Sequence, residues 1–219
     1  MRRLAAILLL SILAILPLFA HDWSDVTARV ERSLVAVTHK DNAGGKHVCG
    51  GFVIHAAKDY ILTARHCIQN APEQKEGEAE IPEKDWPETV VFDVDGVPSR
   101  VIARWPITDL VIVEGGRAKP SLDYRRKPLR KGLPVAVVGF GYGLGTSLLL
   151  TGTIAAPGAF WSQGEIWLTL DFRSIGGMSG GPIFDVDGNV LGVMQRTDDV
   201  TSISRPFSTI IAQTGKFWD

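Results

Sequence analysis

A succession of short runs rich in Val, Ile, Leu and Thr constrains the fold of this chain more than any other feature. Gly, Pro and Asp separate the runs, a pattern that is typical of β-strands joined by turns. The runs span residues 33–38, 48–54, 60–63, 90–94, 97–105, 110–113, 134–139, 147–154, 166–170 and 190–195. Helical periodicity is scarce, and only residues 23–32 and 208–214 favour helices. We therefore predict an all-β fold with short helices near the termini.

A repeated pentapeptide supports a fold made of two similar halves. Phe-Asp-Val-Asp-Gly occurs at residues 92–96 and again at residues 184–188. In both places Asp-Gly lies between β-like runs, which suits a tight hairpin turn. Calcium binding is the alternative use of these Asp pairs, but neither copy has the glycine position or the terminal glutamate of an EF-hand loop. The repeat agrees with two barrels on either side of residues 115–132.

Residues 1–20 have the layout of a secretory signal peptide. Arg2 and Arg3 precede an apolar run over residues 4–16, and Pro17 and the small residue Ala20 follow it. We predict cleavage after Ala20 and a mature domain over residues 21–219, with no stable membrane insertion afterwards. A membrane anchor is the alternative, although the apolar run is short for a span of about 20 residues.

The charge balance gives no reason to expect a nucleic acid partner. Without the two signal-peptide arginines the chain has 21 Lys and Arg against 24 Asp and Glu, a net charge of −3. Residues 73–88 are rich in Glu and Pro, and residues 117–131 carry seven Lys or Arg. We predict a solvated loop and a linker for these two segments, with steering of charged substrates as the alternative.

One serine is surrounded by glycines in the stretch Gly-Gly-Met-Ser-Gly-Gly-Pro-Ile-Phe, residues 176–184. Four glycines in six positions permit a sharp turn and let a substrate approach main-chain N–H groups, as an oxyanion site requires. A serine hydroxyl is a poor nucleophile near neutral pH, so it needs a base, and the base needs a group that orients it. We interpret Ser179 as a nucleophile.

Two further motifs supply the missing groups. Residues 61–67, Ile-Leu-Thr-Ala-Arg-His-Cys, end an apolar run with His66, and residues 108–113, Thr-Asp-Leu-Val-Ile-Val, begin a strand with Asp109. In the order His, Asp, Ser, these motifs resemble those of the chymotrypsin-like serine peptidases, and most of all the bacterial HtrA (Deg) type. The glycine-rich run within residues 135–154 and the Asp-Gly-Asn-Val-Leu-Gly-Val segment are also similar to that family. The resemblance covers about residues 30–212.

This resemblance implies a fold of two six-stranded antiparallel β-barrels with the active site in the cleft between them. The first barrel would cover about residues 30–116, the linker about 117–132 and the second barrel about 133–207. His66 would be the general base, and Asp109 would accept a hydrogen bond from its Nδ1. The main-chain N–H groups of Gly177 and Ser179 would form the oxyanion hole, with Met178 as the third residue of the turn.

The resemblance also implies a disulfide between Cys49 and Cys67, which would staple the histidine loop to the preceding strand. Closing a loop of this size is worth about 3 kcal/mol, and such bonds persist outside the cytoplasm. Two buried free thiols are the alternative. A zinc site that includes His47 and His66 is less favoured, because neighbours such as His66 and Cys67 tend to point apart.

Two details bear on specificity. Met178 stands where the family usually has Asp or Asn, so the polar contact of that side chain is missing. By resemblance, Arg173, Val193, Met194 and Gln195 would line the pocket for the substrate side chain before the scissile bond. Arg173 would favour acidic side chains there if it points inward, and an exposed strand-end position is the alternative.

We therefore predict a secreted or periplasmic serine endopeptidase that acts on protein or peptide substrates through an acyl-enzyme, without a metal or organic cofactor. The chain ends soon after the second barrel, so we expect no PDZ domain. A catalytically latent or inactive form that serves as a binding module is the main alternative. An esterase that uses the same three residues is the other.

Overall fold

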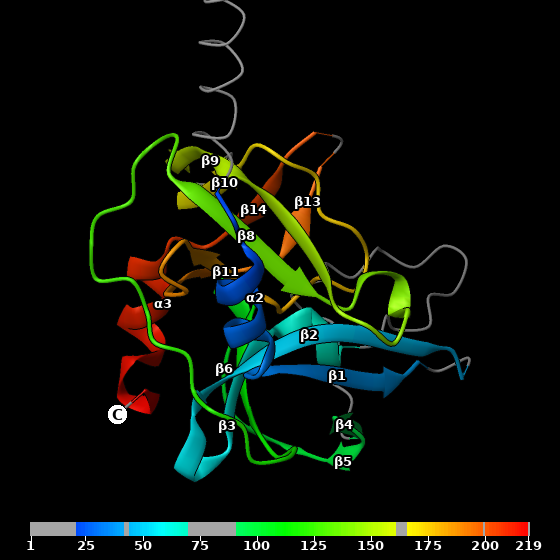
Figure 1. Cartoon of the computed structure of the whole chain (residues 1–219). Helices are drawn as coiled ribbons and strands as arrows, with labels where there is room; N and C mark the ends of the chain where they lie inside the picture. Colours follow the sequence, from blue (N-terminus) through cyan, green and yellow to red (C-terminus); the bar gives the residue numbers. More distant parts are fainter. Residues whose placement is uncertain (1–20, 42–43, 70–90, 161–165, 199, 219) are drawn as a thin grey trace, which may run out of the picture.

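The computed structural model describes residues 21–41, 44–69, 91–160, 166–198 and 200–218, which form two curled antiparallel sheets (Figure 1). The predicted signal peptide and the acidic segment at residues 73–88 lie outside the described residues. Strands account for most of the regular structure, and the helices are short. The predicted all-β class with short terminal helices is confirmed.

The first sheet has the strand order β5-β4-β1-β2-β3-β7-β6. Its strands are β1 (Leu34–Lys40), β2 (Lys46–His55), β3 (Tyr60–Ala64), β4 (Phe92–Val94), β5 (Val97–Pro98), β6 (Arg100–Trp105) and β7 (Leu110–Glu114). The two edge strands, β5 and β6, are consecutive in the chain and only Ser99 separates them. One bent strand therefore closes the sheet into a barrel, and with β5 and β6 counted together the barrel has the six predicted strands.

The second sheet is built in the same way, with the order β12-β11-β8-β9-β10-β14-β13. Its strands are β8 (Pro134–Gly139), β9 (Leu148–Phe160), β10 (Ile166–Leu170), β11 (Pro182–Asp185), β12 (Val190–Val193), β13 (Arg196–Thr197) and β14 (Ser202–Ser204). Its edges, β12 and β13, are separated only by Met194 and Gln195. This closing bend places Gln195 next to the serine turn, as described below.

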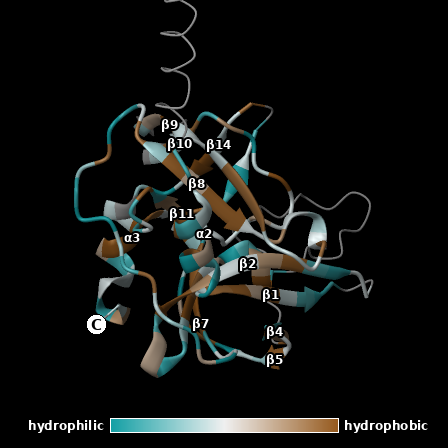
Figure 2. Cartoon of the chain, viewed as in Figure 1, coloured by the Kyte–Doolittle hydropathy of each residue, from teal (hydrophilic) through white to brown (hydrophobic). Residues whose placement is uncertain are grey.

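Some central strands, such as β7 and β8, form continuous apolar runs because both of their faces are buried. In β7, Val111 and Val113 point into the first barrel, whereas Leu110 and Ile112 join a cluster that also contains Phe184 of the second barrel. In Figure 2, β8 is largely brown, whereas the outer ends of β1 and β2 are teal. A third cluster fills the second barrel. The cluster shared between the barrels holds them against each other, and the candidate site lies where they meet.

Two helices cover this shared cluster. Helix α2 (Ser24–Glu31) contributes Val30, and α3 (Phe207–Thr214) contributes Ile210, and neither side chain is exposed. Short 3-10 turns complete the fold: η2 (Ala56–Lys58), η3 (Arg65–Ile68), η5 (Pro106–Thr108), η6 (Gly141–Gly143) and η7 (Gly215–Phe217). Two of these turns, η3 and η5, adjoin the candidate site.

Both copies of the repeated pentapeptide form hairpins, but the turns differ. Between β4 and β5, Asp95 and Gly96 both have positive φ (50° and 77°), as a two-residue type I′ turn requires. Between β11 and β12, Gly188 has φ +81° and the Asp185 carboxylate accepts the N–H groups of Asp187 and Asn189 (both 3.0 Å). The second turn is therefore longer and is held by a side chain.

Candidate active site

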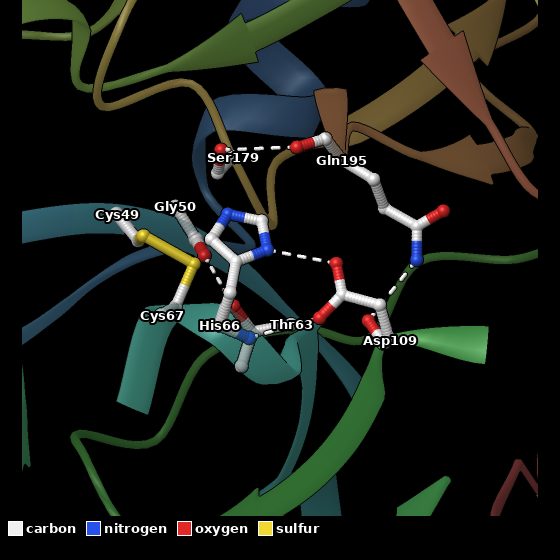
Figure 3. The surroundings of a disulfide bond; sticks show 8 residues. All are labelled: Cys49, Gly50, Thr63, His66, Cys67, Asp109, Ser179 and Gln195. Carbon is white, nitrogen blue, oxygen red and sulfur yellow. Dashed lines mark hydrogen bonds and ion pairs between the residues drawn. A yellow bond between two sulfur atoms is a disulfide. The ribbon is translucent and has the colours of Figure 1, made fainter. Parts of the chain in front are cut away.

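Asp109 and His66 contact each other at two points. Asp109 Oδ2 lies 2.7 Å from His66 Nδ1, and Asp109 Oδ1 accepts the main-chain N–H of His66 at 2.9 Å (Figure 3). The side chains are only 20% (His66) and 14% (Asp109) exposed, so water competes weakly for these bonds. A proton on Nδ1 facing the carboxylate leaves Nε2 as a proton acceptor. The pair is thus oriented for general base chemistry.

The sheet register explains why two residues so far apart in sequence meet. Strands β3 and β7 pair with Ala64 opposite Leu110, so the end of β3 and the start of β7 lie at the same place. The N–H of Arg65 continues the ladder to the carbonyl of Asp109 at 3.0 Å. Asp109 itself adopts a left-handed conformation (φ 53°) after turn η5, which aspartate tolerates better than most residues.

The turn that carries Ser179 is pinned between the two barrels. The carbonyl of Ser179 accepts the N–H of Gly50 on β2 at 2.7 Å, and the N–H of Gly180 donates to the carbonyl of Met194 at 2.7 Å. Gly180 has φ +79°, and a Cβ there would lie 2.1 Å from both Gly50 O and Thr63 Oγ1. The close approach of the barrels at this point therefore requires glycine.

The imidazole of His66 lies between Asp109 and Ser179 in the view of Figure 3. The Ser179 hydroxyl donates a long hydrogen bond to the carbonyl of Gln195, at 3.4 Å. The structure thus brings the three predicted residues into one place, two from the first barrel and one from the second.

In the predicted oxyanion turn, two main-chain N–H groups have no hydrogen-bond acceptor among the described residues. Within the described residues, the N–H groups of Gly177 and Ser179 donate to no acceptor, whereas the N–H of Met178 donates to the carbonyl of Ile175 at 3.2 Å. Gly177 has φ +93°, and a Cβ there would lie 2.3 Å from the carbonyl oxygen of Phe140. Two main-chain donors therefore remain for an anionic oxygen, as oxyanion sites require.

The Met178 side chain is fully buried in the second barrel. The main chain of Met178 also passes close to β8, since a Cβ on Gly139 would lie 2.8 Å from the Met178 Cα. An apolar side chain therefore anchors the serine turn here through packing, at the position where the resemblance would lead one to expect a polar residue.

Cys49 and Cys67 form a disulfide, with their Cα atoms 5.8 Å apart, so that prediction is confirmed and the free-thiol alternative is wrong. The bond ties β2 to η3, which carries His66 (Figure 3). The ligand atoms of Cys49, His66 and Cys67 lie within 4.8 Å of one another, but both sulfurs belong to the disulfide and offer no thiolate to zinc. His47 instead contacts the carboxylate of Asp41 at 2.8 Å.

The residues predicted to line the substrate pocket differ in exposure. Arg173 is exposed and lies near Asp198, whose pKa is lowered mainly by main-chain hydrogen bonds from Thr201 and Val200 and slightly by Arg173. Val193 and Met194 are buried in apolar clusters. Arg173 lies beyond the end of β10 at Leu170, and its place in a substrate pocket stays a prediction. The two buried apolar residues have only main chain to offer a substrate.

Gln195 has a role that the sequence did not suggest. Its side chain is buried, and Nε2 donates to the carbonyls of Thr108 (2.6 Å) and Asp109 (3.0 Å), while Oε1 accepts the N–H of Arg205 (3.0 Å). Arg205 in turn donates from Nη2 to the carbonyl of Ile107 at 2.9 Å. The second barrel thus holds the turn that leads to Asp109. The carbonyls of residues 107–109 lie more than 80 residues from Gln195 and Arg205 in sequence, so no local motif marks these contacts.

Comparison with known proteins agrees with this geometry. The profile of the trypsin-like peptidase domain matches residues 49–193, which is well over half of the chain. The chain therefore belongs to the trypsin-like peptidase family. A search of curated proteins finds no significant match.

Solved structures of bacterial proteases share the fold. The serine endoprotease from Yersinia pestis aligns with TM-score 0.68 and 19% identity, covering 91% of this chain and 67% of that one. The active form of the Rv3671c protease from M. tuberculosis aligns with TM-score 0.68 and 22% identity. The alignment covers 87% of this chain and 83% of that protease. The HtrA-type protease AlgW, solved with a tripeptide, aligns with TM-score 0.70 and 16% identity. The alignment covers 90% of this chain and 64% of AlgW. The chain thus spans about two thirds of the first and third of these proteins.

Proposed function

We propose that this protein is a serine endopeptidase that hydrolyses peptide bonds of protein substrates through Ser179, His66 and Asp109. The observation that carries the proposal is the two-point contact between Asp109 and His66, at 2.7 and 2.9 Å, beside the serine turn. A carboxylate that contacts both the ring and the main chain of one histidine restricts the orientation of that ring, and in Figure 3 its Nε2 lies on the side of Ser179.

The reaction then follows from the positions of the groups. Ser179 Oγ attacks the scissile carbonyl while His66 Nε2 takes its proton, and Asp109 stabilises the imidazolium without taking a proton itself. The N–H groups of Gly177 and Ser179 donate to the oxygen that becomes anionic. His66 gives its proton to the leaving amine, an acyl-enzyme remains on Ser179, and His66 activates the water that hydrolyses it.

An extracytoplasmic location belongs to the same proposal. The Cys49–Cys67 disulfide supports it, because oxidising compartments are where such bonds persist. The layout of residues 1–20 supports it as well. No helix of the described residues is long and apolar enough to cross a membrane.

A catalytically latent form is the second candidate, and one observation favours it. The Ser179 hydroxyl is directed at the carbonyl of Gln195. Met178 adds to this, since its apolar side chain can make none of the polar contacts of the Asp or Asn usual at that position. In this state the fold would act as a binding module until a ligand turned the hydroxyl toward His66.

Hydrolysis of casein and of a nitrophenyl ester by the purified protein tests the proposal. We expect cleavage of casein, loss of at least about a thousandfold in the Ser179→Ala and His66→Ala variants, and native-like circular dichroism for both. Turnover of the ester without any cleavage of casein would identify an esterase. No turnover of either substrate by a folded protein would favour the latent form.

A further inference from the structure

A pocket of about 430 Å³ lies between the first barrel and the glycine-rich loop that contains η6. Lys46 and Val48 of β2 line one side, Phe140 and Gly143 line the other, and Arg117 from the linker contributes to the rim. The proposed mechanism uses none of these side chains.

Both walls of the pocket are attached to the serine turn. Along β2, Lys46, Val48 and Gly50 lie on one face, because side chains two apart in a strand point the same way, and Gly50 donates its N–H to the carbonyl of Ser179. On the other wall, the N–H of Phe140 donates to the carbonyl of Gly177 at 3.3 Å. The pocket thus lies along β2 from the serine turn, and at about 3.3 Å per residue Lys46 is roughly 13 Å along β2 from Gly50.

The charge of the pocket is positive. At its base Lys119 Nζ lies 2.7 Å from Asp95 Oδ2, so these two charges neutralise each other. Lys46 and Arg117 are exposed, and in the part of the chain that the structure describes neither has an ion pair. Among the described residues, two cations without an ion pair therefore face this pocket, and its one described acidic lining residue, Asp95, is already paired.

We infer that this pocket binds an acidic side chain of the substrate, on the stretch of peptide that runs from Ser179 along β2, about three to four residues from the scissile bond. The inference rests on the proposed function, since it names the class of peptide that the same site prefers. Val48 and Phe140 offer apolar surface to the methylene groups of a Glu, and Arg117 offers a planar donor to its carboxylate.

The size of the preference follows from the exposure of the two cations. Exposed ion pairs are worth at most about 1 kcal/mol each, so we expect roughly fivefold tighter binding of a peptide with Glu than of the same peptide with Gln. The difference should disappear in about 1 M salt, where charges are screened within about 3 Å.

Binding to the Ser179→Ala protein tests this inference without depending on turnover. The probes are fluorescein-labelled decapeptides of Ala and Leu, each with one Glu or one Gln placed in turn along the peptide, and Kd is measured by anisotropy. The test variant adds Lys46→Gln and Arg117→Gln. The matched control instead adds Lys127→Gln and Arg130→Gln, which remove the same charge from exposed linker positions outside this pocket.

We expect Kd to be about fivefold lower for the Glu peptide than for the Gln peptide at one or two neighbouring positions. The control variant should keep this difference, and the test variant should lose it. Equal Kd values for Glu and Gln at every position would overturn the inference, and so would an equal preference in the test and control variants. A parallel arm labels the wild-type protein with a fluorophosphonate. Absence of labelling there would contradict the proposed function alone, because the Kd comparison stands without catalysis.

Discussion

At the scale of single residues, the geometry around Asp109 depends on partners from the other barrel. The three carbonyls from Ile107 to Asp109 accept hydrogen bonds from Arg205 and Gln195. Thr108 adds a bond from its hydroxyl to Gln213 Oε1 at 2.6 Å. The carboxylate that orients His66 is therefore placed by a network, and the donors of that network are separate targets for mutation.

Gln195→Glu should lower kcat with little change in KM. The substitution replaces the Nε2 donor with an oxygen that faces the carbonyls of Thr108 and Asp109, and a buried group left unsatisfied costs about 1–3 kcal/mol. We expect a loss of about tenfold or more in kcat and a lower Tm. Gln213→Glu is the matched control, because it keeps the Oε1 acceptor for Thr108. Equal effects of the two substitutions on kcat would contradict this role of Gln195.

Gly180→Ala should abolish activity. Its Cβ would lie 2.1 Å from Gly50 O and Thr63 Oγ1, so the serine turn or β2 has to move. Gly132→Ala is the control, since Gly132 has a similar φ of +73° but no atom within 4 Å of its Cβ position. We expect a loss of about 1–2 kcal/mol of stability in the control from the left-handed backbone alone, with fluorophosphonate labelling retained. Full labelling of Gly180→Ala would show that the turn tolerates a Cβ.

The three proposed catalytic residues could be found from the sequence because each lies in a local motif with its own neighbours. The role of Gln195 could not be found in this way. The resemblance places it in a substrate pocket, whereas its side chain contacts main-chain atoms far away in sequence. The role of Met178 could be predicted only in part. The sequence shows that an apolar residue stands at this position, and the packing of the second barrel explains why it is accommodated there.

At the scale of elements, strands such as β7 and β8 were predictable because burial on both faces makes them apolar throughout. Strand β14 has no such signal, since its sequence Ser-Ile-Ser is short and polar and two of its hydroxyls bond main-chain groups. The closing bends at Ser99 and at Met194–Gln195 were also hidden, because each lies inside or at the end of one predicted run. An apolar run in the sequence indicates a buried strand. Barrel closure depends on pairing between segments that are distant in the sequence.

Removal of the disulfide should weaken the element that carries His66. In Cys49→Ala/Cys67→Ala the link between β2 and η3 is lost, and for a loop of 18 residues we expect a loss of about 3 kcal/mol. Urea unfolding followed by circular dichroism measures the change. The residual folded protein should label more slowly with a fluorophosphonate, because η3 is less constrained. Unchanged stability would mean that β3 and β7 alone fix this turn.

At the scale of the whole molecule, the site exists only where the two barrels meet. His66 and Asp109 come from the first barrel and Ser179 from the second, and one apolar cluster with Phe52 and Phe184 spans both. The barrels are therefore expected to unfold together. In guanidinium chloride, tryptophan fluorescence and fluorophosphonate labelling should be lost in one coincident transition. Loss of labelling well before the fluorescence change would instead show that the barrels separate before they unfold.

The central claim is that Ser179 is an activated nucleophile beside a formed oxyanion site, and fluorophosphonate labelling followed by intact-mass measurement tests it most directly. The account predicts one added adduct on the folded wild-type protein and none on Ser179→Ala or on heat-denatured protein. A folded wild-type protein that gains no adduct would contradict the claim, and the Met178 turn would then hold the site in a latent state.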